Sequence, residues 1–464
     1  MKLPEILKTI SKKLHKKNAK AIIVGGAVRD HFLQLPFKDI DIEVYGLEHM
    51  EALESLLKEY GSVNLVGKSF GVLKLSYEGE EYDFSFPRME SKVGEGHRGF
   101  EVEVNGSLDF KTAAKRRDFT LNALGYDVEE KKFLDPFSGL KDIEQKQLRH
   151  IDDETFIEDP LRVYRAVQFC ARFGFDLAKE TFVLCKHMVK KGMLEELAKE
   201  RVYIEWKKLL LKSEKPSLGF ELMKELGIME RYFPELHALI GIKQSPKWHP
   251  EGDVWIHTMM TLDEMVQICR SNLFSQDNKY KLRMMFAILC HDLGKATHTT
   301  IDNDGRIRAI GHEEAGLVPT KNLIYRLSDE HDFIESLLPL VEHHLKPSQF
   351  YAAKSKASAI RRLATKVNIE ELIVVAKADF LGRTTKESLA GIYHAGEWLL
   401  EKSKALKVIN KPLAHLLQGR DLIDLGFKPS ILFKEILDAV YTLQIDGVIL
   451  TKEEAIDFVE KKYK

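Results

Sequence analysis

The stretch AIIVGGAVRDHFLQLPFKDIDIEV, residues 21–44, combines residue types that suit phosphate chemistry. Alternate side chains of a β-strand share one face, so DIDIEV places Asp39, Asp41 and Glu43 on the same side. Two carboxylates about 7 Å apart repel each other unless a cation lies between them. Mg²⁺ takes a few carboxylates and completes its shell with water and phosphate oxygens. Asp83, in EYDFSF, is a candidate third ligand.

The glycine turn before these acids adds a place for phosphate. Gly25 and Gly26 let backbone N–H groups approach an anion closely, and the N-terminus of a following helix favours negative charge. Arg29, one turn into that helix, has the fork geometry to bind phosphate oxygens. Asp39 and Asp41 alone also fit a solvated acidic strand. The combination favours phosphoryl or nucleotidyl transfer, with both acids catalytic.

A second group of residues, between 249 and 383, suits divalent transition metals. Imidazole and carboxylate side chains recur there in HPEGDVWIHTMM, CHDLGK, GHEEAG, VEHHLKP and AKADFLGR. A single histidine in a helical protein is more often structural, but adjacent His and Asp with flanking histidines are typical of a metal site. The predicted ligands are His257, His291, Asp292 and Asp379; His312 and His343 are candidates for a second metal or phosphate, and Lys295 for phosphate neutralisation.

Hydrophobic periodicity divides the chain into two kinds of structure. Short strand-like runs cover 21–26, 39–46, 70–77, 81–86 and 100–104, with an amphipathic helix at 50–61. After residue 140 the period of 3.6 residues prevails, which predicts helices. The expected fold class is therefore α+β, a small α/β head followed by helical segments.

Composition is that of an ordinary globular chain. Of 464 residues 44% are apolar and 30% charged, and the net charge of -1 gives no overall attraction to nucleic acid. The four cysteines lack CxxC spacing, which argues against a disulfide framework and fits a reducing compartment. No apolar run reaches the length of a membrane span. We expect a cytoplasmic protein without membrane association.

These motifs resemble a known family. GGAVRD followed by KDIDIEV is similar to the polymerase-β-like nucleotidyltransferases, and within them to the class II tRNA CCA-adding enzymes and bacterial poly(A) polymerases. RRDFTLNAL, DPFSGL, EDPLRVYRAVQFCARF and KERVYIEWKKLL follow in the expected order. The histidine-rich region resembles the HD phosphohydrolase superfamily. A head of this kind joined to an HD domain resembles the multifunctional subfamily of bacterial CCA-adding enzymes.

The resemblance implies five segments. These are a nucleotidyltransferase head at 1–140, a helical neck with the nucleotide-selecting motif at 141–215, a helical body segment at 216–245, an HD phosphohydrolase domain at 246–395 and a helical tail at 396–464. It implies CCA addition to the 3′ end of tRNA from CTP and ATP with Mg²⁺, in a monomer or homodimer. For the HD site it implies phosphatase and 2′,3′-cyclic phosphodiesterase activity with Ni²⁺, Mn²⁺ or a similar ion.

The EDPLR motif offers a way to select nucleotides without a template. Cytosine and adenine present an exocyclic amine beside a ring-nitrogen acceptor, which a carboxylate and a guanidinium match. The i, i+3 spacing of Asp159 and Arg162 predicts that they converge, and a plain salt bridge is the alternative. The resemblance places Arg117, Asp118 and Arg165 at the nucleotide as well.

Several alternatives stay open. An A-adding enzyme or a poly(A) polymerase shares every motif. A CC-adding enzyme is expected to have a shortened loop, whereas 88–117 is a full-length segment here. An HD hydrolase with an RNA-binding head and a structural tRNA-binding protein need no intact set of Asp39, Asp41, Arg117, Asp159 and Arg162, which argues against both.

Overall fold

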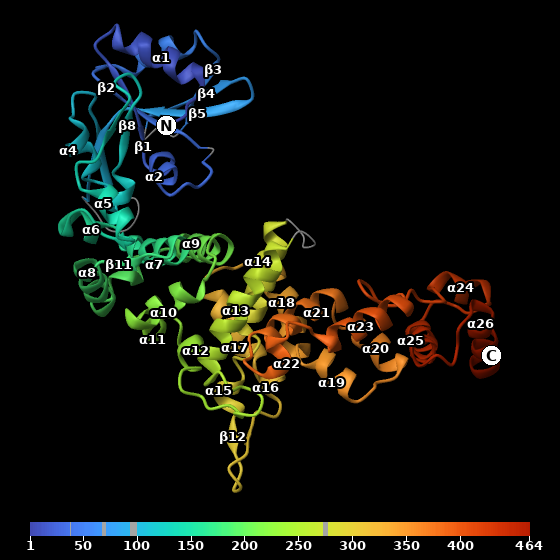
Figure 1. Cartoon of the computed structure of the whole chain (residues 1–464). Helices are drawn as coiled ribbons and strands as arrows, with labels where there is room; N and C mark the ends of the chain where they lie inside the picture. The colour runs from blue at the N-terminus through green and yellow to red at the C-terminus, as the bar shows by residue number, and fades with distance from the viewer. Residues whose placement is uncertain (38, 67–70, 93–99, 272–276) are drawn as a thin grey trace. The chain divides into compact units, whose positions relative to one another are not determined.

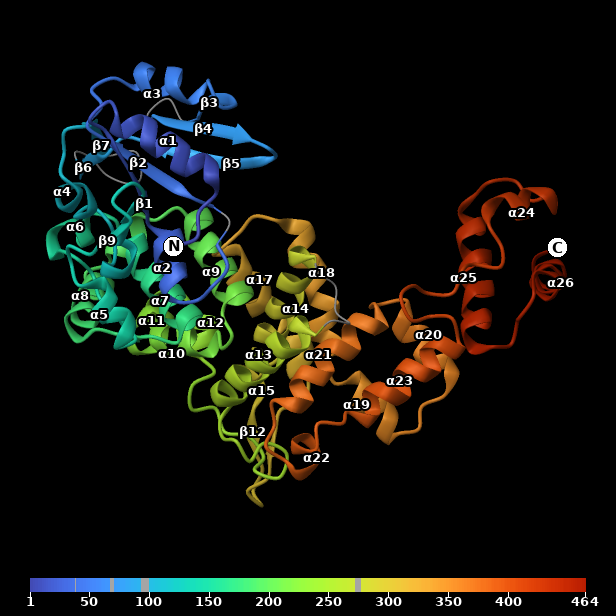
Figure 2. The same cartoon turned by 45° about the horizontal axis from the view of Figure 1, so that its top comes forward.

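The computed structural model describes residues 1–37, 39–66, 71–92, 100–271 and 277–464. The chain forms two compact units, Met1–Ile228 and Met229–Lys464. Figure 1 follows the chain from the N-terminal sheet to the C-terminal helices, and Figure 2 shows the same elements turned by 45°.

A mixed β-sheet forms the first part of the N-terminal unit. Among the described residues its strand order is β3-β4-β5-β2-β1-β8-β9, and only β2 and β5 run parallel, every other pair being antiparallel. The strands are β1 (Lys20–Val24), β2 (Asp41–Tyr45), β3 (Ser62–Val66), β4 (Val72–Tyr77), β5 (Glu80–Ser85), β8 (Gly125–Asp127) and β9 (Lys132–Leu134). The acidic strand β2 therefore lies near the centre of the sheet, between β1 and β5.

Alternation along the strands explains the two faces of this sheet. Ile23 packs into the larger core, together with helices α1 (Glu5–His15), α2 (Gly26–Phe32) and α3 (Met50–Leu57). Its neighbours Ile22 and Val24 pack on the other face with residues of helix α4 (Phe110–Ala114). Burying one such side chain contributes about 1.5–3 kcal/mol. Both faces are thus covered, and the ends of β1 and β2 are held rigidly.

Helices complete the N-terminal unit. They are α5 (Gly139–Glu144), α6 (Asp153–Glu158), α7 (Leu161–Phe173), α8 (Lys179–Lys190), α9 (Lys199–Lys212) and α10 (Ser217–Glu225), with 3-10 turns η1 (Thr120–Asn122) and η2 (Met193–Glu196) and strand pairs β6 (Arg88–Lys92) with β7 (Phe100–Val104) and β10 (Gln147–Leu148) with β11 (Asp176–Leu177). Helix α7 packs against α9 and α10. Trp206 and Phe220 meet edge to face in their core, 5.2 Å between ring centroids.

The C-terminal unit is helical. Its helices are α12 (Pro234–His237), α13 (Val254–Arg270), α14 (Asn278–Cys290), α15 (Lys295–His298), α16 (His312–Ala315), α17 (Leu317–Tyr325), α18 (His331–His343), α19 (Lys346–Ala352), α20 (Ala357–Ala364), α21 (Ile369–Leu381), α22 (Lys386–Leu389), α23 (His394–Ala405), α24 (Gly419–Asp424), α25 (Ile431–Asp446) and α26 (Lys452–Tyr463), while α11 (Ile228–Tyr232) begins at the junction of the two units. Helices α13, α14, α18 and α21 pack together, α24 to α26 form a separate small core, and β12 (Thr300–Ile301) pairs with β13 (Ile307–Arg308).

The predicted α+β class is confirmed, as are the strands at 21–26, 39–46, 81–86 and 100–104 in their main parts. Strand β2 begins at Asp41, so Asp39 precedes it. Residues 93–99 of the loop used against CC-only addition lie outside the described residues, as do residue 38 and 67–70. No helix in the described part is long and apolar enough to cross a membrane. All four cysteines are buried and free.

Candidate active sites

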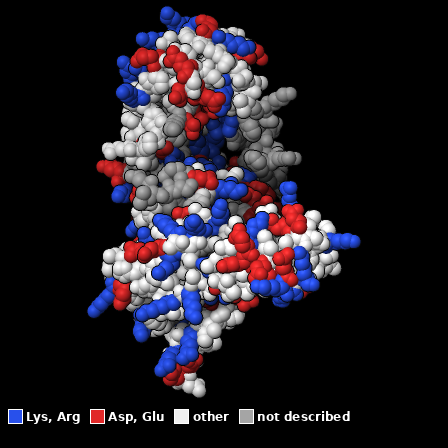
Figure 3. All heavy atoms as spheres, turned by 90° about the vertical axis from the view of Figure 1, so that its right-hand side faces the viewer, with Lys and Arg blue, Asp and Glu red and all other residues white. Residues whose placement is uncertain are grey.

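A cavity of about 350 Å³ opens at the end of β1 and β2. Its lining comprises Gly25, Gly26, Arg29, Asp41, Arg88, Arg116, Arg117, Asp118, Asn122, Asp159, Leu161, Arg162, Arg165 and Arg201. Most of the charged side chains are arginines, and Figure 3 shows basic side chains gathered in a hollow of the surface with acidic ones at its upper rim. Positive charge of this kind favours a polyphosphate.

The predicted metal acids lie on adjacent strands. Asp41 of β2 and Asp83 of β5 are direct partners in the parallel register. Desolvation in the pocket raises the pKa of Asp41 above its usual 3.8, Arg117 opposes this, and the carboxylates of Asp83 and Asp39 add to the rise. Asp83 Oδ1 is buried and accepts no hydrogen bond from any described residue, and Lys74 Nζ lies 3.7 Å from it. An unshielded carboxylate cluster of this kind fits a divalent cation.

Glu43, the third acid of DIDIEV, has a different task. Its Oε1 accepts hydrogen bonds of 2.9 Å from both Arg116 and Arg117, and its Oε2 accepts one of 2.7 Å from the Tyr45 hydroxyl. Burial alone would raise the pKa of Glu43, but the two guanidinium groups lower it. Glu43 therefore holds two arginines beside Asp41. The sequence showed that Glu43 shares a face with Asp41 but not that it binds these arginines.

Asn122 and Asp118 fix the other predicted nucleotide-binding residues. Asn122 accepts a 2.7 Å hydrogen bond from Arg29 Nη1 and donates one of 2.8 Å to Asp118. Arg29 is buried and also bonds Asp30, so its phosphate role stays a prediction. Arg165 Nε donates to Asp118 at 2.7 Å. Burial would raise the pKa of Asp118, but Arg165 and Asn122 lower it below 3.8.

Asp159 and Arg162 line the same cavity but do not bond each other through their side chains. Asp159 lies at the end of α6, before Pro160, with φ -121° and ψ 96°. Its carboxylate accepts from Leu161 N at 3.2 Å and from Arg201 Nη2 at 3.2 and 3.4 Å. Arg162 donates to the carbonyls of Thr155 and Arg116 at 2.6 and 2.7 Å. The predicted convergence at i, i+3 fails because the helix breaks at Pro160.

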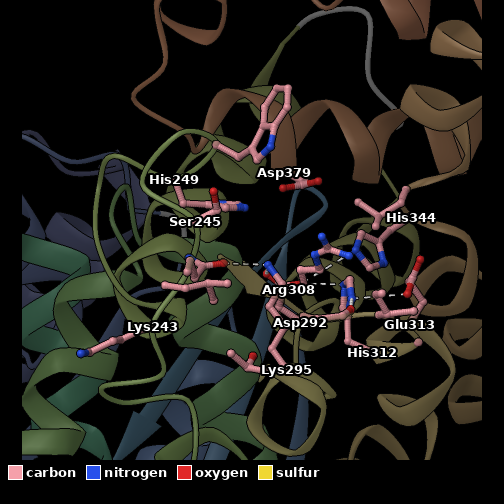
Figure 4. Close-up of a pocket in the computed structure, with 18 of the residues that line it drawn as sticks. Lys243, Ser245, His249, Asp292, Lys295, Arg308, His312, Glu313, His344 and Asp379 are labelled. Atoms are coloured by element: carbon pink, nitrogen blue, oxygen red, sulfur yellow. Dashed lines mark hydrogen bonds and ion pairs between the residues drawn. The ribbon is translucent and has the colours of Figure 1, made fainter. Parts of the chain in front are cut away.

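The second cavity, of about 420 Å³, lies in the C-terminal unit. Its lining includes Lys243, Gln244, Ser245, Trp248, His249, Asp292, Lys295, Arg308, His312, Glu313, His344, Asp379 and Arg383. Figure 4 shows Asp292, His312 and His344 close together, with Asp379 above them in this view. The residues come from α13, α14, α16, α18 and α21 or directly follow them.

Two groups of possible metal ligands meet here. His257, His291 and Asp379 form one, and Asp292, His312 and His344 form the other, each with ligand atoms within 4.8 Å. Asp292 faces both, because its Oδ2 lies 3.2 Å from His291 Nε2 and its Oδ1 lies 3.3 Å from His312 Nε2. The structure thus groups His344 with these ligands, whereas His343, which sequence reasoning chose, lies outside the pocket lining.

The orientation of three rings supports metal binding. His291, His312 and His344 each direct Nδ1 to the backbone carbonyl three residues earlier, at 2.6, 2.6 and 2.7 Å. Their Nε2 atoms are buried and make no hydrogen bond within the described chain. A carbonyl partner at Nδ1 fixes the tautomer that leaves the Nε2 lone pair free. Burial lowers the pKa of His344 to about 3, which also keeps that ring neutral.

Glu251 joins two histidines at the rim of the cluster. Its Oε1 lies 2.9 Å from His249 Nδ1 and 2.8 Å from His257 Nδ1, and its Oε2 accepts from Thr384 N at 3.1 Å. His257 Nε2 lies 3.0 Å from Asp379. An acid at Nδ1 that leaves Nε2 for the metal is a common second layer of metal sites. Sequence reasoning quoted HPEGD for its histidine and missed this acid.

Each buried acid of the cluster also has a basic neighbour. Lys295 Nζ lies 2.6 Å from Asp292 Oδ2 and 2.7 Å from Gln244 Oε1. Arg383 Nη2 donates to both oxygens of Asp379 at 2.7 and 2.9 Å. Burial would raise the pKa of both acids, but for Asp292 the His291 and Lys295 charges, and for Asp379 the Arg383 charge, hold it well below 3.8.

Comparison with known families agrees with this division. The family model described as poly A polymerase head domain matches residues 21–149, the one described as probable RNA and SrmB-binding site of polymerase A matches 174–240, and the HD domain matches 254–383. Fold and sites therefore define a nucleotidyltransferase-type head joined to an HD domain. The predicted enzyme class is confirmed.

The chain belongs to the multifunctional CCA protein family. A relative of that name from Pseudoalteromonas atlantica is 36% identical over 372 residues, covering 78% of this chain and 85% of the relative. Another from Pasteurella multocida is 34% identical over 430 residues, covering 90% of this chain and 94% of the relative. The family suggested by the motifs is thereby confirmed.

Solved structures share the fold. The Thermotoga maritima CCA-adding enzyme complexed with tRNA is similar with a TM-score of 0.61 and 21% identity, over 100% of this chain and 97% of that one. The Bacillus stearothermophilus CCA-adding enzyme in complex with CTP has a TM-score of 0.64 and 20% identity, over 100% and 98%. At this identity the likeness concerns the fold.

Proposed function

We propose that the chain adds C, C and A to the 3′ end of tRNA, using CTP and ATP. The observation that carries this proposal is a single cavity lined by the phosphate-type glycine turn, Asp41 and the Asp159–Arg162 pair. The relatives named multifunctional CCA protein, and the similar folds solved with CTP and with ATP, support it. Cytoplasmic location and a monomeric or homodimeric state stay predictions.

Asp39 and Asp41, with Asp83 beside them, would hold Mg²⁺ in this site. Such a cation supplies charge neutralisation at the α-phosphate and at the leaving pyrophosphate. The residues of the chain do the rest. Glu43 holds Arg116 and Arg117 at the cavity, so that their positive charge faces the triphosphate without rearrangement. The raised pKa of Asp41 follows from crowded negative charge, which a cation would relieve.

Base selection rests on Asp159 and Arg162. The carboxylate accepts the exocyclic amine of cytosine or adenine, and the guanidinium donates to the adjacent ring nitrogen. Uracil and guanine would place a carbonyl against the carboxylate and an N–H against the guanidinium, leaving buried polar groups unpaired at about 1–3 kcal/mol each. Both side chains are held by other protein groups, so the pair is ordered before a nucleotide arrives.

Primer-specific addition tests the proposal. The chain is incubated with tRNAs ending before the tail, at C and at CC, with each NTP alone. We expect CTP addition to the first two and ATP addition to the third. An A-adding enzyme would act only on the third, and a poly(A) polymerase would extend with ATP without stopping. Failure on all three would leave an HD hydrolase with an RNA-binding head.

A second activity is favoured by the buried imidazoles of the C-terminal unit. We propose that His257, His291, Asp292 and Asp379 hold one divalent metal, and that His312 and His344, sharing Asp292, hold a second. Such ions activate water for attack on phosphorus. The proposed substrates are phosphomonoesters and 2′,3′-cyclic phosphates. Metal-stripped protein should regain hydrolysis of a 2′,3′-cyclic nucleotide with Ni²⁺, Mn²⁺ or Mg²⁺, and indifference to all three would contradict the ligand assignment.

A further inference from the structure

Arg201 is the one residue bonded to the base-reading pair that the EDPLR motif does not contain. It lies in the first turn of α9, 42 positions beyond Asp159, and its Nη2 lies 3.2 Å from Asp159 Oδ2 and 3.4 Å from Oδ1. Both side chains are largely buried, 24% and 23% exposed, and both line the cavity. Motif spacing gives no hint of this contact.

The donors around Asp159 are unevenly divided. Oδ1 is approached by Leu161 N at 3.2 Å and by Arg201, whereas Oδ2 is approached by Arg201 alone. An ionised carboxylate has about four lone-pair positions. Oδ2 therefore keeps acceptor capacity for an exocyclic amine, and its direction is set by Arg201.

Arg162 is fixed in another way. Its Nη1 and Nη2 each donate to a backbone carbonyl, those of Thr155 and Arg116. A guanidinium carries five N–H donors, so donors remain for a ring nitrogen. Main-chain carbonyls are present whatever the side chains nearby, whereas the anchor of Asp159 depends on one side chain. Arg201 is accordingly the vulnerable element of the reading pair.

We propose that Arg201 is a positioning residue for nucleobase selection, which holds the Asp159 carboxylate so that Oδ2 faces the amine of cytosine or adenine. This inference rests on the proposed nucleotidyltransferase function. Helices α7 and α9 pack directly on each other, so α9 offers a firm base for the anchor. Arg201 acts through Asp159 and makes no contact with the base itself.

The test compares kcat/KM for CTP and UTP on tRNA lacking its tail. In Arg201→Gln we expect the CTP-to-UTP preference to fall about tenfold, mainly through KM for CTP, since coupled neighbours in one network interact by about this factor. Arg201→Lys keeps the charge and should recover part of the preference. Arg149→Gln is the matched control, because Arg149 pairs with Asp142 and Glu180 outside the cavity. Its preference should equal that of the wild type.

A double variant separates positioning from direct contact. In the Asp159→Ala background, Arg201→Gln should change the preference no further. A further fall would overturn the proposal, because Arg201 would then read the base itself. An unchanged preference in the folded single variant, with normal thermal unfolding, would also overturn it. If instead the wild-type protein adds no nucleotide, the proposed function fails and not this inference alone.

Discussion

Glu251→Gln should weaken metal binding in the C-terminal unit without affecting nucleotide addition. The Glu251 side chain is only 1% exposed and receives hydrogen atoms from His249, His257 and Thr384 N. A glutamine offers one acceptor oxygen and one NH₂ group, so at least one of these three donors loses its partner. An unpaired buried donor costs about 1–3 kcal/mol. The ring of His257 then loses its fixed orientation toward Asp379.

The expected consequence is a metal affinity about 10- to 100-fold lower, the range found when such supporting acids are removed. Calorimetric titration of the metal-stripped full chain with Mn²⁺ or Ni²⁺ measures it directly. Hydrolysis of a cyclic phosphodiester should fall at limiting metal and recover at saturation. Nucleotide addition serves as the internal control, because all residues lining its cavity lie in the other unit.

Glu371→Gln is the matched control for this experiment. Glu371 is also a buried acid of the C-terminal unit, but it pairs with Arg283 and lies outside the pocket lining. It should bind metal like the wild type. The reasoning is refuted if Glu251→Gln binds metal with wild-type affinity, because the acid would then not orient His257. Equal losses in both variants would point to general destabilisation.

Three further outcomes are expected. Asp41→Ala should abolish nucleotide addition and leave cyclic phosphodiester hydrolysis intact, and loss of both in a folded variant would contradict two separate sites. Asp292→Ala should end hydrolysis while addition to tRNA persists, because one side chain contacts both ligand groups. The lowered pKa of Asp118 contributes stability above pH 3.8 that is lost as pH falls below it. Urea unfolding between pH 6 and 3 should therefore show a steeper acid loss in wild type than in Asp118→Asn.

The sequence predicted the central strands well because their apolar runs are long and alternate regularly. Strands β8 and β9 were missed, since three residues such as Gly125–Asp127 carry too little pattern to distinguish a strand from a turn. The small hairpin of β12 and β13 was missed for the same reason. Their places are set by pairing with neighbours far along the chain, which periodicity does not reveal.

In the sites, the residue types were predictable and their partners were not. The spacing of Asp159 and Arg162 suggested a shared helix face, but Pro160 after Asp159 was a readable signal that the helix breaks there. Arg201 and Glu251 act through tertiary contacts and leave no local pattern. Between the adjacent residues His343 and His344, composition offers no choice, and only the direction of the helix end decides which ring reaches Asp292.

The basic partners of the hydrolase acids bear on how the protein matures. Asp292 is paired with Lys295 and Asp379 with Arg383, so neither buried negative charge needs an ion for compensation. In domains that fold only around a metal, ligand repulsion and exposed polar groups keep the apo chain unfolded. Here folding and metal acquisition are separable steps. A newly made chain in a metal-poor cell would fold and serve tRNA at once, and would acquire its hydrolase later, when the ion becomes available.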